Sequence, residues 1–254
     1  MSQDQRADAP PRRQAQARPA RGGRLGAVVQ GVLIALGLVG LVGGFLLIAV
    51  QYRPYAVPTD SMDPTIHSGT TVLAHTVSGG QVGRGDIVVF RDPAWGNTPL
   101  VKRVVAVGGD TVACCDKQGR VTVNGTAVDE PYLNHTVGLG TSAFSAKVPA
   151  GSIFLLGDNR AVSLDSRVHL DQLDGSVPAT DVLGRVEGAV WPLGKAGTID
   201  RTSAFDALPG QDATAHGLLG PAAYATIGGA VLVLVTAAAG SAAGRIRRSR
   251  AARN

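Results

Sequence analysis

Three stretches of the chain carry residue types that support nucleophilic catalysis. Ser61 lies in a proline-bracketed turn, and Lys102 lies within the apolar run Leu100–Val107. The third stretch, Gly157–Arg167, is rich in polar groups and follows directly on the apolar run Ile153–Leu156. Polar loops on a rigid scaffold are where binding and catalysis are most often found, so these stretches are the candidates for a site.

A serine and a lysine can work together only if the lysine is neutral. A serine hydroxyl is a weak nucleophile at neutral pH and needs a base within hydrogen-bond reach. Free lysine has a pKa of about 10.4, so a neutral amine at pH 7 needs a shift of about three units, or roughly 4 kcal/mol. Burial supplies such a shift, and the valines around Lys102 suit a buried position. The alternative is that Lys102 and Arg103 are exposed strand cations and that Ser61 is an ordinary turn serine.

The other chemically active residue types are scattered along the chain. There is no metal-ligand spacing of cysteine and histidine, no phosphate loop and no dinucleotide fingerprint, so we expect neither a metal nor an organic cofactor. Cys114 and Cys115 are adjacent, and neighbouring cysteines close only a small, strained ring. We expect two thiols on opposite faces of a strand, although an oxidising compartment would permit a disulfide.

Two long apolar segments flank the stretches that carry this chemistry. No charged residue occurs from Leu25 to Val50 or from Pro221 to Gly244. About 20 apolar residues cross the hydrocarbon layer of a bilayer, so both segments are predicted to be membrane-spanning helices. The first is too long for the apolar core of a cleaved signal peptide. The second is rich in alanine and glycine, and a buried helix of a globular domain is the alternative.

The chain has a net charge of +5, and its positive charge is concentrated at the two ends. Six arginines lie in residues 1–24 and five in residues 245–254. Because basic flanks mark the cytoplasmic ends of spanning helices, we expect two cytoplasmic basic tails, the first of them disordered, and residues 51–216 outside the cytoplasm. Nucleic-acid binding would call for basic charge spread over a folded domain, so we expect no nucleic-acid partner.

The segment between the two apolar helices has the pattern of a β domain. Short runs rich in valine, isoleucine and threonine alternate with polar turns, and Asn124-Gly125 is typical of a type I′ hairpin. We expect a mainly β fold, with an antiparallel, barrel-like catalytic domain over residues 51–194, a linker over 195–216 and spanning helices over 25–50 and 217–244. The expected strands are Thr70–Ala74, Ile87–Phe90, Leu100–Val107, Thr111–Cys115, Arg120–Val123, Ile153–Leu156 and Leu183–Val190.

Taken in order, these stretches resemble the motifs of bacterial type I signal peptidases, which are membrane-bound serine proteases with a Ser/Lys dyad. Ser61 to Thr65 matches Ser-Met-x-Pro-Thr, and Gly157 to Arg167 matches Gly-Asp-Asn-Arg-x-x-Ser-x-Asp-Ser-Arg. Lys102-Arg103 and Gly109-Asp110 match the two ends of the motif between them. The resemblance runs from about Val57 to Pro192. Lysine rather than histidine at position 102 is similar to the bacterial type. The short gap between Ser61 and Lys102 resembles compact Gram-positive members, and the second apolar segment and the high alanine, glycine and arginine content resemble actinobacterial ones.

The resemblance implies a role for each residue of the site. Ser61 is the nucleophile, Lys102 is the general base, and the Ser163 hydroxyl orients the amine. The Ser61 backbone N–H, helped by the Thr59 hydroxyl, holds the oxyanion. Two further residues brace the site as an ion pair, Asp165 and Arg167. The family's preference for small residues at the −1 and −3 positions of the substrate implies shallow apolar pockets, for which adjacency to the dyad suggests Pro58, Met62 and Val101.

The implied reaction is hydrolysis of exported preproteins at the end of their signal peptides, at the outer surface of the cytoplasmic membrane. We expect a multi-pass monomer whose partners are the preproteins and the lipid bilayer. The run Val168-His169-Leu170 and the loop on to Pro178 depart from the aromatic-glycine run of many relatives, which leaves the packing there open. Two rival hypotheses remain: a soluble-type Ser/Lys autoprotease, which leaves the spans and the third motif unexplained, and a membrane-anchored binding or chaperone module without turnover.

Overall fold

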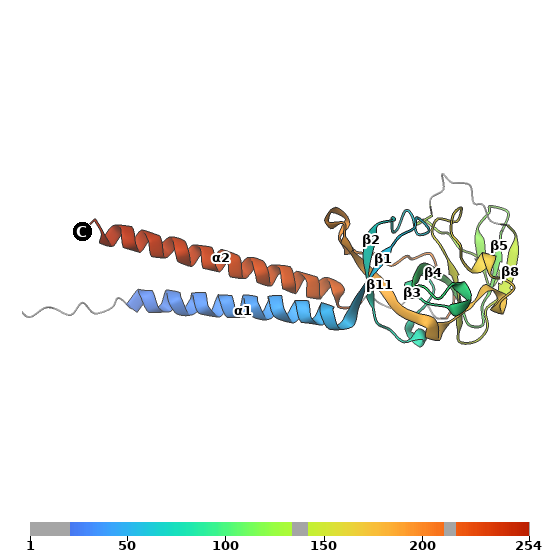
Figure 1. Cartoon of the computed structure of the whole chain (residues 1–254), viewed down its shortest axis with the longest axis horizontal. Coiled ribbons are helices and arrows are strands. Elements are labelled where there is room, and N and C mark those ends of the chain that lie inside the picture. Colours follow the sequence, from blue (N-terminus) through green and yellow to red (C-terminus); the bar gives the residue numbers. More distant parts are fainter. Residues whose placement is uncertain (1–20, 134–141, 211–216, 254) are drawn as a thin grey trace, which may run out of the picture. The chain divides into compact units, whose positions relative to one another are not determined.

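The computed structural model describes residues 21–133, 142–210 and 217–253. Helix α1 (Arg21–Gln51) begins the described chain, helix α2 (Leu219–Ala251) closes it, and the strands lie between them in sequence (Figure 1). Both helices are long and apolar enough to cross a membrane, over Leu25–Gln51 and Leu219–Ile246. Most of the predicted first basic tail lies outside the described residues. Helix α2 extends beyond its predicted end at residue 244 and continues through the arginine-rich segment as far as Ala251.

The chain divides into two compact units, one formed by its two ends up to Gly40 and from Gly228, and the other by Leu41–Ile227. Within the first unit, a Cβ added at Gly37 would lie 2.9 Å from the Gly229 carbonyl oxygen, so the two helices approach closely there. The Gln30 Nε2 donates a 3.4 Å hydrogen bond to the Thr236 carbonyl oxygen. Small residues and polar side chains with a backbone partner are typical of helix contacts in lipid.

The second unit is built on two antiparallel sheets. The larger sheet has the strand order β1 (Tyr52–Val57), β2 (Thr70–His75), β11 (Val182–Trp191), β3 (Ile87–Phe90), β4 (Leu100–Val107), β9 (Ser152–Leu156), β10 (Val177–Pro178), and β12 (Gly197–Thr198) pairs with β11. The smaller sheet has the order β7 (Thr126–Ala127), β6 (Val121–Val123), β5 (Thr111–Cys114), β8 (Phe144–Lys147). The predicted mainly β, antiparallel architecture is confirmed, with the larger sheet an open half-barrel that has β1 and β10 at its edges.

Each predicted strand is present, and β3 and β4 match their predicted bounds to the residue. Asn124 and Gly125 have φ angles of 53° and 80° in the β6–β7 turn, which confirms the type I′ hairpin. Strands β1, β8, β10 and β12 were not predicted. The sequence of β1 continues the apolar helix and contains an arginine and a proline, whereas β8 is short and only two of its residues are buried.

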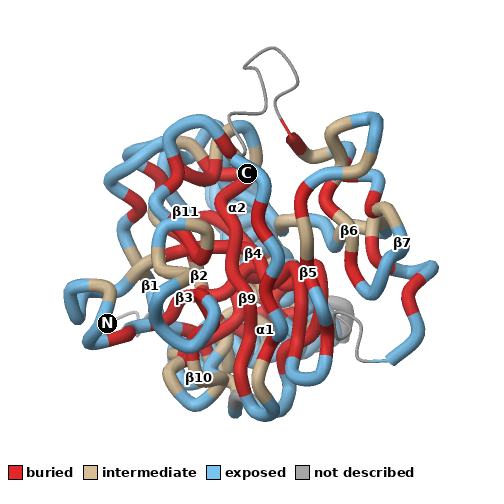
Figure 2. Tube along the Cα trace, turned by 90° about the vertical axis from the view of Figure 1, so that its right-hand side faces the viewer, coloured by how far each residue is buried: buried red, intermediate tan, exposed pale blue. Residues whose placement is uncertain are grey.

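The core lies around the neighbouring strands β4 and β9, which are buried along most of their length (Figure 2). Phe154 and Leu156 of β9 contribute to a cluster that also contains Phe205 and Leu208, which are 1 % and 4 % exposed. The segment predicted as a linker is therefore part of the folded unit over its described residues up to 210, because β12 pairs with the sheet and these two side chains are buried in the core.

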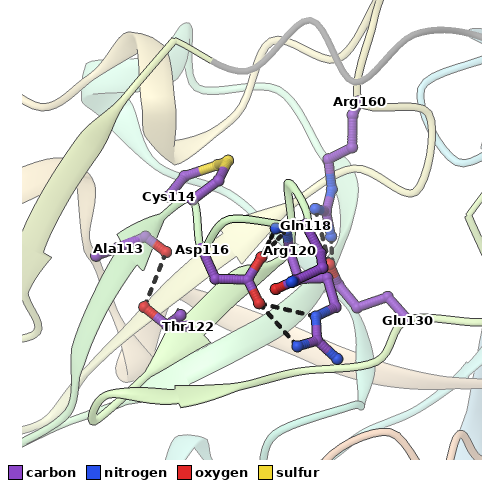
Figure 3. Close-up of a disulfide and its surroundings, with 9 residues drawn as sticks. Ala113, Cys114, Asp116, Gln118, Arg120, Thr122, Glu130 and Arg160 are labelled. Atoms are coloured by element: carbon purple, nitrogen blue, oxygen red, sulfur yellow. Dashed lines mark hydrogen bonds and ion pairs between the residues drawn. A yellow bond between two sulfur atoms is a disulfide. The ribbon is translucent and has the colours of Figure 1, made fainter.

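Cys114 and Cys115 form a disulfide at the end of β5 (Figure 3). The expectation of two thiols on opposite faces of a strand is therefore wrong. Opposite orientation requires both residues to lie in the strand, but β5 ends at Cys114 and the chain leaves the sheet at Cys115. The turn that follows is closed by Asp116, whose side chain accepts a 2.9 Å hydrogen bond from the Arg120 Nε.

Candidate active site

Ser61 lies in a tight turn between β1 and β2. The turn is closed by a 2.9 Å hydrogen bond from the Ile66 N–H to the Met62 carbonyl oxygen, and both of these side chains are buried in the core. The Ser61 carbonyl oxygen accepts a 3.1 Å hydrogen bond from the Asn159 N–H. The position of Ser61 is thus fixed by two contacts: the apolar packing of its turn against the core, and the hydrogen bond to the loop after β9.

Lys102 enters the site from the centre of the larger sheet. It lies in β4 opposite Val88 of β3 and is only 4 % exposed. Its Nζ lies 2.9 Å from the Ser61 Oγ and 3.1 Å from the Val101 carbonyl oxygen, within hydrogen-bond distance of both. The two residues that the sequence singled out are therefore in direct contact, and the reading of Lys102 as an exposed strand cation is wrong.

The surroundings of Lys102 shift its protonation equilibrium toward the neutral form, compared with a free lysine. Burial lowers the pKa of Lys102 from 10.5 to about 8, against the opposing effect of the Asp165 and Asp158 carboxylates. At pH 7 a pKa of about 8 leaves roughly one amine in ten neutral. The amine is therefore available as a base at neutral pH, because burial outweighs the attraction of the two carboxylates.

Thr59 and Ser163 both lie near the dyad, but in different ways. The Thr59 hydroxyl donates a 3.2 Å hydrogen bond to the Ser61 Oγ. The Ser163 Oγ is buried without a hydrogen-bond partner, and it occupies the space that a Cβ at Gly157 would need. The expected hydrogen bond from the Ser163 hydroxyl to the Lys102 amine is therefore not made, and the Val101 carbonyl takes that place.

The expected ion pair between Asp165 and Arg167 is present. The Arg167 Nε lies 2.8 Å from the Asp165 Oδ1, and the Arg167 Nη2 lies 2.9 Å from the Asp165 Oδ2. Asp165 has no exposed surface and also accepts a 3.0 Å hydrogen bond from the Gly157 N–H. The pair therefore fixes the polar loop onto the end of β9.

A second buried ion pair joins the three motifs, and sequence reasoning gave its members no role. Arg103, the neighbour of Lys102, donates from Nε and Nη2 to the two carboxylate oxygens of Asp158 at 2.8 and 2.6 Å. Asp158 also accepts a 2.6 Å hydrogen bond from the Thr65 hydroxyl. All three residues lie inside the recognised motifs, and this position was the feature of the sequence that could have indicated a role for them.

A third buried pair attaches the polar loop to the segment after β7. Arg160 donates from Nη1 and Nη2 to the Glu130 carboxylate at 3.0 and 2.5 Å, and both side chains are about 5 % exposed. The Tyr132 hydroxyl donates to the same carboxylate at 2.5 Å, and the Arg103 guanidinium lies 3.9 Å from the Tyr132 ring centroid. Arg103 and Arg160 are thus each paired with a buried carboxylate, whereas the Lys102 amine contacts the Ser61 hydroxyl.

An open cavity of about 680 Å³ lies over the dyad. We call it the catalytic cavity, and its lining residues are Thr59, Asp60, Ser61, Ala94, Trp95, Leu100, Lys102, Asn159, Val162, Leu164 and His169. The expected wall residues differ from these. Met62 is fully buried in the core and Val101 is 7 % exposed, so neither presents a free surface, and Pro58 is exposed outside the lining. The walls come instead from segments distant in sequence.

Among the described residues, histidine, cysteine, aspartate and glutamate do not form a group of three or more that would hold a metal ion. What the site offers instead is a hydroxyl nucleophile, a buried amine of lowered pKa and an open cavity. This set is suited to acyl transfer through a covalent intermediate.

Comparisons with known proteins agree on one family. The model of the signal peptidase family, peptidase S26, matches residues 26–191. Signal peptidase I of Mycobacterium tuberculosis (strain H37Rv) is 32 % identical over 216 residues, which cover 65 % of this chain and 73 % of that protein. Signal peptidase I of Bacillus licheniformis is 38 % identical over 156 residues, or 58 % of this chain and 80 % of that protein. A crystal structure of a signal peptidase I from Enterococcus faecalis matches 40 % of this chain and 93 % of its own at 32 % identity, with a TM-score of 0.34.

Proposed function

This chain belongs to the signal peptidase family, peptidase S26, and from that premise we propose that it cleaves signal peptides from preproteins with Ser61 as nucleophile and Lys102 as general base. The protein is a membrane-anchored serine endopeptidase. The observation that carries the assignment is the 2.9 Å contact between the Lys102 Nζ and the Ser61 Oγ inside a buried setting.

The first half of the reaction forms an acyl-enzyme. The neutral Lys102 amine takes the proton of the Ser61 hydroxyl as Oγ attacks the carbonyl carbon of the scissile peptide bond. Negative charge develops on the carbonyl oxygen, and we assign its stabilisation to the Ser61 backbone N–H and the Thr59 hydroxyl. The protonated Lys102 then gives its proton to the departing amine, which is the N-terminus of the mature protein.

The second half of the reaction releases the signal peptide. The departure of the amine leaves Lys102 neutral, so it can take a proton from a water molecule that attacks the Ser61 ester. The ester bond breaks, the proton returns to the Ser61 Oγ, and the signal peptide leaves with a free carboxylate. Asp165 and Arg167 keep the loop beside Lys102 in position, and neither they nor Ser163 takes a proton in this scheme.

Preprotein cleavage by the detergent-solubilised full chain tests this proposal. We expect Ser61→Ala and Lys102→Met to remain folded and to lose cleavage, since each removes one partner of the dyad. Ser145→Ala and Lys147→Met are matched controls, because both residues are exposed on β8 in the smaller sheet. Normal processing by either dyad variant would refute the assignment. Cleavage only of the enzyme's own chain would favour the autoprotease, and binding without turnover would favour the chaperone module.

We also propose that α1 and α2 both span the cytoplasmic membrane, with both termini in the cytoplasm and the catalytic domain outside it. The length and apolar character of the two helices and the arginines at the chain ends support this topology. It places the domain where exported preproteins emerge. Protease added to intact cells should digest the catalytic domain. Digestion only in inverted vesicles would show that the domain lies in the cytoplasm and would refute the proposed topology.

We propose that the protein is a monomer. Light scattering of the solubilised protein measures its molar mass and tests this proposal.

A further inference from the structure

Trp95 contributes an aromatic wall to the catalytic cavity. It ends the short 3₁₀ turn η2 (Pro93–Trp95), which is capped by Asp92 through a 2.6 Å hydrogen bond from the Ala94 N–H to the Asp92 Oδ1. The indole lies edge-on against the fully buried ring of Phe90, with centroids 5.3 Å apart. Trp95 is thus held by the core through β3, although its own side chain is only partly buried.

His169 completes this wall from the loop between Arg167 and Pro178. The 3₁₀ turn η3 (Ser166–Val168) comes directly before it, and the His169 N–H donates a 3.2 Å hydrogen bond to the Ser166 carbonyl oxygen. Ser166 is fully buried and accepts a 2.8 Å hydrogen bond from the Leu155 N–H of β9. The His169 and Trp95 rings stack with centroids 4.2 Å apart and an interplanar angle of 17°. Both rings are therefore held before any substrate arrives.

The surroundings of the stacked pair have the character of a binding surface. Trp95 and His169 line the same cavity as Ser61 and Lys102. On the same lining, Leu164 and Val162 are 73 % and 58 % exposed, although both are large aliphatic side chains. Exposed apolar groups gathered beside a buried polar site are typical of a surface that a ligand covers.

We propose that the stacked rings of Trp95 and His169 bind an apolar substrate side chain close to the scissile bond, at a position other than −1 or −3. This inference rests on the proposed function. The occupant is the preprotein itself, because a peptide bond that reaches Ser61 must lie in this cavity and brings its neighbouring residues against the wall. The rings offer a flat apolar face, and the cavity of about 680 Å³ is larger than small side chains at −1 and −3 require.

The test uses the full chain in detergent and a series of signal-peptide substrates. Each substrate replaces one leucine by alanine at one position from −6 to +4, leaving −1 and −3 unchanged. For the wild-type enzyme we expect one position at which this replacement lowers kcat/KM by roughly tenfold. For Trp95→Ala the same replacement should lower kcat/KM less than twofold, and Trp95→Phe should keep most of the preference. His169→Ala should weaken it, because the indole loses its stacking partner.

Trp191→Ala is the matched control, because Trp191 is also exposed, at 57 %, but lies at the end of β11 outside the cavity lining. An equal loss on every substrate in Trp95→Ala would mean a purely structural role and would overturn the inference. So would an unchanged preference, or an effect that appears only in lipid vesicles, which would assign the wall to the membrane. If the wild-type enzyme cleaves none of the substrates, the proposed function fails. If it cleaves them but Trp95→Ala leaves the substrate preference unchanged, only the proposed role of the Trp95–His169 wall is refuted.

Discussion

The Thr65 hydroxyl donates a 2.6 Å hydrogen bond to the Asp158 Oδ2, although the two residues lie 93 positions apart in sequence. Thr65 belongs to the turn that carries Ser61, and Asp158 belongs to the loop after β9. Asp158 is also paired with Arg103, the neighbour of Lys102. One buried carboxylate therefore connects the nucleophile turn, the lysine strand and the polar loop.

We predict that Asp158→Asn lowers the free energy of unfolding by about 3 kcal/mol, because it leaves the Arg103 guanidinium buried without its counter-charge. Thr65→Val should cost only about 1 kcal/mol, since it removes one hydrogen bond and leaves the ion pair intact. Thermal unfolding of the solubilised chain measures both. Asp206→Asn is the control, because its ion pair with Arg201 is exposed and should contribute little. Equal costs for Asp158→Asn and Asp206→Asn would contradict the prediction.

The activity should depend on pH through the protonation of Lys102. Only the neutral amine accepts the Ser61 proton, and burial lowers the pKa of Lys102 to about 8. We therefore predict that kcat/KM falls about tenfold for each pH unit below 8 and levels off above it. Initial rates on a peptide substrate between pH 6 and 9.5 measure this profile.

Asp165→Asn provides an internal check on that profile. The Asp165 carboxylate raises the pKa of Lys102 against the effect of burial. Replacing that carboxylate by a neutral amide should therefore move the midpoint of the pH–rate profile below 8. The position of the midpoint is the readout, because the variant also loses an ion pair and its maximal rate will fall. A wild-type rate that does not change between pH 6 and 8 would exclude Lys102 as the titrating base.

The same burial makes Lys102 costly to stability. Its pKa is about 8 in the folded state against 10.5 in the ordinary state, so the unfolded chain binds more protons between these values and stability rises with pH across that window. Below pH 8 the full cost of about 3 kcal/mol applies, and above 10.5 it vanishes. Lys102→Met, although inactive, should therefore be more stable than the wild type at pH 7 by up to this amount.

Chemical unfolding of both proteins at pH 7, 9 and 10.5 measures this difference. The stability gap should narrow as the pH rises, because the wild type loses its penalty and the methionine variant never had one. Lys147→Met, an exposed lysine substitution, should show no such gap. A gap that stays constant from pH 7 to 10.5 would mean that packing, and not the buried charge, separates the two proteins.

Local sequence pattern predicted the parts of the fold whose burial is complete. Ile87–Phe90 and Leu100–Val107 are apolar along nearly their whole length because they lie in the middle of the larger sheet, and the structure confirms their bounds. The contact between Ser61 and Lys102 was predictable because each lies in a recognisable motif. Local pattern does not predict burial that depends on single side chains. Phe205 and Leu208 are buried in the core although the segment around them is mostly polar.

The residues that line the catalytic cavity could not be predicted from the sequence for a different reason. Trp95 and His169 lie 74 positions apart, at the ends of two short 3₁₀ turns with no periodic pattern, and only the tertiary fold brings their rings together. Adjacency to the dyad suggested Met62 instead. That residue faces the core because the turn that directs Ser61 toward the cavity directs the next side chain inward. Proximity in sequence is a poor guide to pocket walls wherever the chain turns sharply.

Gly157 lies where the loop after β9 passes close to the turn that carries Ser61. A Cβ at this position would lie 2.5 Å from the Ser61 carbonyl oxygen and would overlap the Ser163 Oγ. We predict that Gly157→Ala lowers kcat by at least roughly a hundredfold, since a shift of about 1 Å in a catalytic group has that effect. Gly194→Ala is the matched control, because a Cβ there meets no atom within 4 Å.

A double variant identifies which contact matters. Ser163→Gly removes the serine side chain that a new Cβ would meet but leaves the Ser61 carbonyl oxygen in place. If displacement of Ser61 causes the loss, Gly157→Ala combined with Ser163→Gly should stay nearly as inactive as Gly157→Ala alone. Recovery to the level of Ser163→Gly would instead assign the loss to the serine at position 163. In either case the pH midpoint of residual activity should stay near 8, because Gly157 carries no charge that acts on Lys102.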